Sequence, residues 1–135
     1  MKRELFFIAP LFFLIINAAH TYGQLCQPKP QGWTVNICVP RTEAKGVNLW
    51  IGPGGGDEGT RRFWKTWHKG DPTDFPVPTY LLFAKEIWMK VETLEEDKNV
   101  NVRTLFNGRT TKNWETDGRI DDETSRTDTG DCKCD

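Results

Sequence analysis

The chain has 135 residues, of which 37% are hydrophobic and 27% are charged, and its formal net charge at pH 7 is −1. This length corresponds to one small domain that can bury its own core. The near-neutral balance excludes a general electrostatic attraction to nucleic acid or to an anionic membrane surface.

The N-terminal residues carry the pattern of a secretory signal peptide. A basic start precedes an apolar run over residues 5–19, and the small residue Gly23 stands directly before the expected cleavage point. The run is shorter than the roughly 20 residues that a transmembrane helix needs. We therefore expect residues 1–23 to be removed and residues 24–135 to form a single secreted, extracellular domain with no membrane span.

Four cysteines lie at the two ends of the expected mature domain: Cys26 and Cys38 near its start, and Cys132 and Cys134 near its end. Cysteines of a secreted domain are usually paired. A bond between Cys132 and Cys134 would close a strained ring around a single residue. The sequence therefore predicts a double clasp, in which each N-terminal cysteine bonds a C-terminal one, in an order that it leaves open.

Short segments rich in β-branched and aromatic residues predict strands at 33–39, 47–51 and 61–68. Glycine-rich residues 52–59 predict a flexible loop. Its G-x-G-x-x-G run predicts no dinucleotide cofactor, because acidic residues would repel a phosphate and no helix is expected to follow. Residues 70–78 contain three prolines, and we expect no regular structure there.

Residues 80–94 fit two structures. Their apolar residues recur at helical spacing, whereas residues 87–91 alternate between apolar and other side chains as in a strand. A clear strand at 100–106 follows a polar turn, so that a hairpin is the natural arrangement and favours the strand. The alternative is one helix at about 79–97.

The stretch from Glu86 to Gly108 resembles a hairpin common in laminin-G and concanavalin-like β-sandwiches. The resemblance rests on Trp88, the alternating apolar residues around it, the polar turn, the strand at 100–106 and the Asn107-Gly108 turn. We predict a mostly β fold: a small antiparallel β-sandwich, jelly-roll-like, with its N- and C-terminal ends clasped by disulfides. The helical alternative would make the fold α+β.

Residues 61–69 are the strongest candidate for binding, with four fixed positive charges and three aromatic rings. Rings stack on sugar faces, and Arg and Lys pair with sulfate, phosphate or carboxylate groups. Strict alternation would place Phe63 on the same face as Trp67, and Trp64 on the opposite face. The predicted contact residues are Arg61, Arg62, Trp64, Trp67 and His68.

Residues 113–131 are polar and predict a loop that the cysteine clasp holds at its end. Its acidic side chains could bind calcium weakly, although their spacing matches no EF-hand. A solvated acidic loop is the simpler interpretation. The acidic residues are Asp117, Asp121, Asp122, Glu123, Asp128 and Asp131.

The sequence offers little for catalysis. Ser125 is the only serine, and His68 is the only histidine of the expected mature domain. With oxidised cysteines, no nucleophile–base pair, cofactor or metal site is predicted.

We expect a non-enzymatic domain that binds an extracellular glycan, matrix component or protein surface, and not nucleic acid. The alternatives are a structural extracellular-matrix protein with weak calcium or mineral contact, and a secreted toxin or defence protein.

Overall fold

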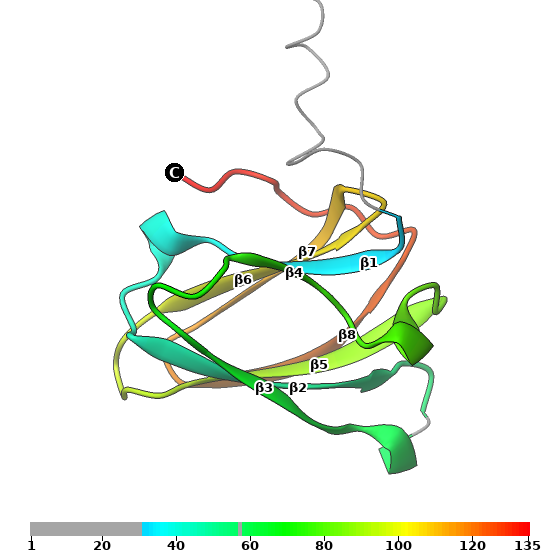
Figure 1. Cartoon of the computed structure of the whole chain (residues 1–135), viewed down its shortest axis with the longest axis horizontal. Helices are drawn as coiled ribbons and strands as arrows, with labels where there is room; N and C mark the ends of the chain where they lie inside the picture. The colour runs from blue at the N-terminus through cyan, green and yellow to red at the C-terminus, as the bar shows by residue number, and fades with distance from the viewer. Residues whose placement is uncertain (1–30, 57) are drawn as a thin grey trace, which may run out of the picture.

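The computed structural model describes residues 31–56 and 58–135, which form a sandwich of two four-stranded antiparallel sheets (Figure 1). Sheet A has the order β4–β1–β6–β7, and sheet B has the order β3–β2–β5–β8. The strands are β1 (Trp33–Ile37), β2 (Gly46–Pro53), β3 (Arg62–His68), β4 (Asp74–Pro76), β5 (Glu86–Thr93), β6 (Val100–Phe106), β7 (Arg109–Thr116) and β8 (Arg119–Ser125). Three short 3-10 turns join them: η1 (Val39–Arg41), η2 (Glu58–Thr60) and η3 (Thr79–Leu81).

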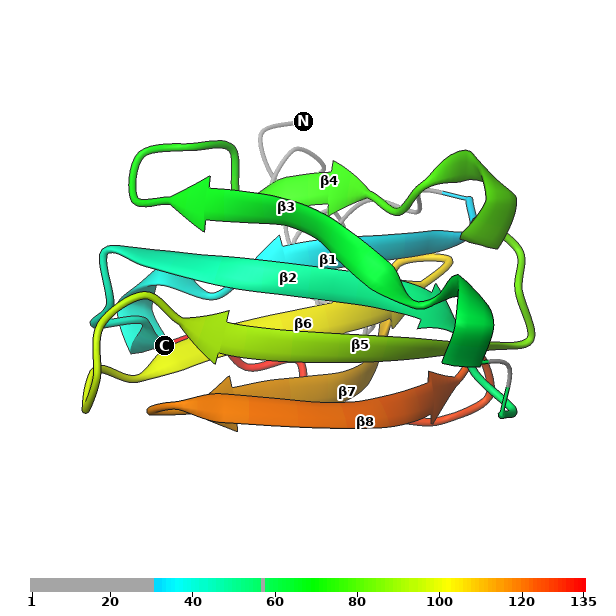
Figure 2. The same cartoon turned by 90° about the horizontal axis from the view of Figure 1, so that it is seen from below.

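The predicted mostly β sandwich is confirmed, and the helix considered for 79–97 is not formed. That segment contains the turn η3 and the strand β5 (Figure 2). Its alternating residues decide the structure, because Ile87, Met89 and Val91 are all fully buried between the sheets. No helix in the described part of the chain is long and apolar enough to cross a bilayer.

The predicted hairpin between residues 86–91 and 100–106 is wrong in its pairing. Both segments are strands, but β5 pairs with β2 and β8, whereas β6 pairs with β1 and β7. The connection between them crosses from sheet B to sheet A, so both strands face the same core from opposite sides. The Asn107-Gly108 turn is confirmed: both residues have positive φ, 52° and 81°, and join β6 to β7.

Two segments expected to be irregular contain strands. Residues 70–78 include β4, an edge strand in which Pro76 is tolerated because β4 pairs only with β1. Residues 113–131 include the second half of β7 and all of β8. The side chains of β8 that face inward are only partly apolar, so the sequence lacks the usual strand signal there.

Three tryptophans form the centre of the core, each with its indole N–H satisfied. Trp33, Trp67 and Trp114 are at most 1% exposed. Their Nε1 atoms donate to acceptors at 2.7, 3.2 and 3.2 Å, respectively the carbonyl oxygens of Ala84 and Pro72 and the hydroxyl of Thr104. Burial of rings this large with paired donors stabilises a small domain efficiently.

A disulfide joins Cys38 to Cys134, with 5.5 Å between the Cα atoms, and links positions 96 residues apart. It confirms that a cysteine near the N-terminus bonds one near the C-terminus. The other bond of the predicted clasp would join Cys132 to Cys26. Because Cys26 lies outside the described residues, that bond stays a prediction.

The C-terminal segment runs along the outer side of sheet A (Figure 1). Gly130 donates its N–H to the Thr110 carbonyl at 2.9 Å, and the Asn113 side chain donates to the Asp131 carbonyl at 2.6 Å. The disulfide therefore fixes a segment that is otherwise held mainly by hydrogen bonds.

Candidate functional site

The predicted contact residues belong to β3 and the residue before it, at the edge of sheet B, where a β-bulge changes the direction of the side chains. Leu49 of β2 lies opposite Lys65, but the next residue, Trp50, lies opposite Phe63. Trp64 is therefore the extra residue of the bulge. Alternation restarts at this point, so that Phe63 and Trp67 face opposite sides of the sheet.

Trp67 faces the core. It lies opposite Val47, is only 1% exposed and donates its indole N–H to the Pro72 carbonyl. This burial is incompatible with the predicted contact role, because a partner at the surface cannot reach the ring. Trp67 therefore contributes to stability.

Trp64 closes the open edge of the sandwich between β3 and β4. Its ring meets the Phe75 ring of sheet A edge to face, with 5.4 Å between the centroids. The Lys65 ammonium lies 4.1 Å from the centre of the same Phe75 ring. Since one side of Trp64 packs against Phe75, its main role is to join the two sheets.

The other predicted residues do not form one site. Arg62 and His68 are exposed at opposite ends of β3. The backbone N–H of His68 donates to an Asp71 carboxylate oxygen at 2.8 Å, which fixes the local turn. Of the five predicted residues, only Arg61 belongs to the cluster on the outer side of sheet B.

The outer side of sheet B carries a row of cross-strand contacts. Phe63 of β3, Trp50 of β2, Lys90 of β5 and Asp121 of β8 are successive partners in the sheet register. The rings of Phe63 and Trp50 meet edge to face at 5.3 Å, and the Lys90 ammonium lies 4.2 Å from the centre of the Trp50 ring. Phe63 remains 50% exposed. The row is thus an aromatic surface with a cation on it.

A second row lies next to the first. Arg61 stacks over Trp88, with 4.8 Å from its guanidinium carbon to the ring centre, and forms a 2.8 Å ion pair with Glu123. Gly52, the β2 partner of Trp88, makes this possible, because a Cβ there would lie 2.7 Å from Arg61 atoms. We call the two rows the outer aromatic face, formed by Trp50, Arg61, Phe63, Trp88, Lys90, Asp121 and Glu123.

The outer aromatic face carries both signs of charge. Its two cations, Arg61 and Lys90, are matched by two carboxylates, Asp121 and Glu123. Such a face does not select a polyanion, because the carboxylates oppose it. It offers rings for apolar contact and, between them, donors and acceptors for hydroxyl groups.

Sequence reasoning missed most of this face. Trp88 and Lys90 could have been found, because they alternate with the buried residues Ile87, Met89 and Val91. The outward position of Phe63 could not have been found from the sequence, since it depends on the bulge. No sequence signal marks an extra residue within β3.

The acidic residues considered for weak calcium binding are dispersed. Asp122 and Glu123, neighbours in β8, point to opposite faces, and each pairs with a cation: Lys112 at 3.0 Å and Arg61 at 2.8 Å. Asp128 accepts the Ser125 N–H at 2.9 Å. The part of the chain that the structure describes holds no group of three or more His, Cys, Asp or Glu side chains able to hold a metal ion.

The pKa of Asp122 lies below its usual value of 3.8. The main cause is the hydrogen bond from the Glu123 N–H, at 2.8 Å, and the second is the ion pair with Lys112. A lowered pKa in the folded state stabilises the protein above the unfolded-state pKa, and this stabilisation is lost as the pH falls through the folded pKa.

Replacement of Asp122 by Asn is therefore expected to lower the free energy of unfolding at pH 7 by less than about 1 kcal/mol, because the side chain is 55% exposed. The difference between variant and wild type should shrink towards zero below the lowered pKa. Urea unfolding between pH 2 and pH 7 measures it. A difference independent of pH would contradict the assigned ion pair.

Comparison with models of protein families, with curated proteins and with solved structures finds no match to this chain.

Proposed function

We propose that this protein is a secreted, non-enzymatic domain that binds an extracellular glycan on the outer aromatic face. The observation that carries the proposal is the grouping of three partly exposed rings, Trp50, Phe63 and Trp88, on one side of one sheet. Aromatic groups are efficient anchors because they offer large apolar area with few rotatable bonds.

A glycan suits the polar groups of this face as well as its rings. Sugar rings present C–H groups on their flat sides and hydroxyl groups at their edges. The C–H groups can pack on Trp50 and Phe63, while Asp121 accepts from hydroxyls and Lys90 donates to them. The balance of charge favours a neutral glycan.

The sheet holds these groups in place before a ligand arrives. Trp50 and Trp88 lie on β2 and β5, the two central strands of sheet B, each paired on both sides. Side chains on paired central strands lose little freedom on binding, which limits the entropic cost. Secretion is supported by the Cys38–Cys134 disulfide, since such bonds persist in oxidising compartments.

A glycan array with labelled protein, followed by calorimetry on the glycan with the highest signal, tests the proposal. The double variant Trp50→Ala/Phe63→Ala should weaken binding at least tenfold, or about 1.4 kcal/mol. The matched control is Arg62→Gln/His68→Ala, two exposed residues of the same strand outside the face. This control should bind like the wild type.

One result would contradict the proposal. If Trp50→Ala/Phe63→Ala binds the selected glycan as tightly as the wild type, the outer aromatic face is not the site. Equal losses in the control variant would show binding by general charge or by misfolded protein.

A further inference from the structure

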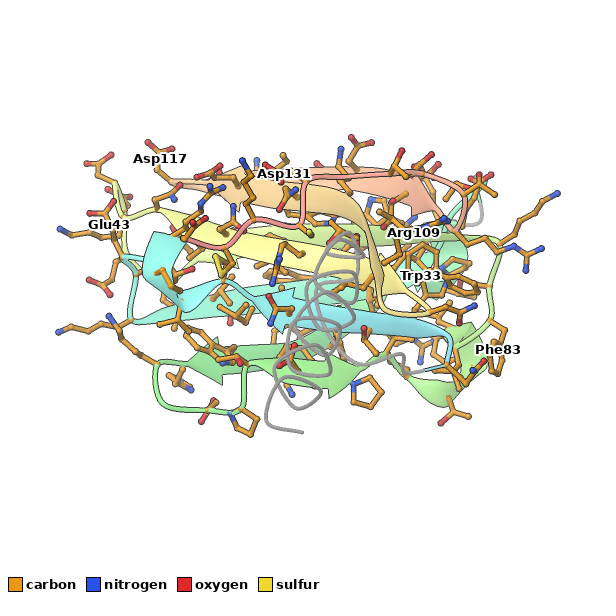
Figure 3. All side chains as sticks on the ribbon, turned by 90° about the horizontal axis from the view of Figure 1, so that it is seen from above. Trp33, Glu43, Phe83, Arg109, Asp117 and Asp131 are labelled. Atoms are coloured by element: carbon orange, nitrogen blue, oxygen red, sulfur yellow. A yellow bond between two sulfur atoms is a disulfide. The ribbon has the colours of Figure 1, made fainter. Side chains whose placement is uncertain are left out.

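A pocket at one end of the sandwich, on residues outside the outer aromatic face, has the chemistry of an anion site. Its volume is about 350 Å³, and it is lined by Phe106, Asn107, Arg109, Arg126 and Thr127. Figure 3 shows Arg109 at the same end as Trp33 and Phe83, whereas Glu43 and Asp117 lie at the opposite end. The lining thus contains two arginines and no carboxylate.

Neither arginine is neutralised within the described residues. Arg109 and Arg126 are exposed, and their guanidinium groups take part in none of the ion pairs of the described chain. A guanidinium group binds carboxylate, sulfate or phosphate through two parallel hydrogen bonds. Two such groups in one pocket leave positive charge that no described residue neutralises, and a bound anion would neutralise it.

The backbone under Arg109 is fixed by the turn between β6 and β7. Asn107 and Gly108 occupy the left-handed region of φ, as a tight two-residue turn requires. Gly32 donates its N–H to the Asn107 side-chain oxygen at 2.7 Å, and Asn107 donates its own N–H to the Gly32 carbonyl at 3.0 Å. The turn is therefore bound to the residue before β1, and this contact fixes the position of the Arg109 backbone.

The segment that carries Arg126 is fixed in a similar way. Arg126 donates its N–H to the Lys85 carbonyl at 3.0 Å. The nearby Asp128 carboxylate accepts the Ser125 N–H at 2.9 Å and the Thr124 hydroxyl at 3.3 Å. The Asp128 side chain thus stabilises the turn that contains it.

Phe106 gives the pocket an apolar wall. Its ring is half-buried and meets Trp33 edge to face, with centroids 5.2 Å apart. Small-ligand pockets combine such apolar walls with a few fixed polar groups and start at about 300 Å³. The pocket is therefore large enough for one ring.

We infer that this pocket binds the oxyanion of a small ring-bearing ligand, with Arg109 and Arg126 on the carboxylate or sulfate and Phe106 against the ring. The inference is independent of glycan binding by the outer aromatic face. A variant whose outer aromatic face no longer binds glycan would keep this site.

Titration of ¹⁵N-labelled protein with glucuronate, galactose 6-sulfate and neutral galactose, at constant ionic strength, tests the inference. At least one anion should shift the backbone signals of Asn107 and Thr127, and galactose should not. Response to glucuronate alone assigns a carboxylate ligand, response to the sulfated sugar alone assigns a sulfate, and response to both assigns a general oxyanion site.

Substitution of the two arginines tests whether they bind the anion. Arg109→Gln and Arg126→Gln should each weaken binding of the active anion at least tenfold, while the unfolding temperature stays unchanged because both residues are exposed. Arg62→Gln, which removes an exposed arginine outside the pocket, should have no effect. The inference is overturned if neither anion binds, if galactose binds equally well, or if Arg62→Gln weakens binding as much as the pocket variants.

Discussion

Removal of the Cys38–Cys134 disulfide by the double substitution Cys38→Ala/Cys134→Ala is expected to lower the free energy of unfolding by about 3 kcal/mol. For a domain of this size, the unfolding temperature should fall by about 12–24 °C. The bond joins residues 96 apart, so its loss frees a long loop in the unfolded chain. A second clasp bond would already restrict the same loop, which keeps the expected loss within the usual range.

Urea unfolding of wild type and variant under non-reducing conditions measures this loss. Lys133→Ala is the matched control, because Lys133 is exposed and lies between the two C-terminal cysteines. The control should unfold like the wild type. A loss below about 0.5 kcal/mol in the double cysteine variant would contradict the stabilisation expected from the Cys38–Cys134 bond.

Trp67→Ala is expected to lower the free energy of unfolding by about 3–5 kcal/mol. The ring is fully buried between the sheets, and its loss leaves a cavity and an unpaired Pro72 carbonyl. Trp50→Ala, on the other face of the same sheet, should cost only about 1 kcal/mol, because it loses cross-strand contacts at a partly exposed position.

Denaturant titrations of both variants test this contrast, with the slope of the transition as a check that both unfold in one step. Similar costs for Trp67→Ala and Trp50→Ala would contradict the placement of Trp67 in the core and of Trp50 on the outer side of sheet B. The contrast also separates stability from binding, since Trp67→Ala should not change the affinity of molecules that remain folded.

The strands in the middle of the chain were predictable because they are long and rich in apolar and β-branched side chains. The strands β2, β5 and β6 were located from such patterns, and the Asn107-Gly108 turn from its backbone requirement. The strand pairing was not predictable. A six-residue connection after β5 suits a hairpin or a crossing between sheets equally well, and only packing of the whole core selects the crossing.

The edges of the sheets were the least predictable part of the fold. The strand β4 has three residues, one of them proline, and β8 shows hardly any apolar side chains. Edge strands pair on one side and face solvent over much of their surface, so their sequences carry little of the usual signal.

Of the contact residues predicted from the sequence, only Arg61 belongs to the outer aromatic face that is proposed as the binding site. Residues 61–68 do lie at the edge of the sheet that carries the outer aromatic face, and Arg61 belongs to that face. The bulge at Trp64 moves the ring of Phe63 outward, while Trp67 keeps the core position. Charge and aromatic content located the segment, but only the register shows which rings a partner can reach.

The most direct test of glycan binding on the outer aromatic face follows the indole N–H signals of the six tryptophans while the array-selected glycan is titrated. Trp33, Trp67 and Trp114 are buried with bonded indoles and should not respond. The proposal predicts that the signals of Trp50 and Trp88 shift and saturate with the calorimetric affinity. Saturated binding with both of these signals unmoved would contradict it.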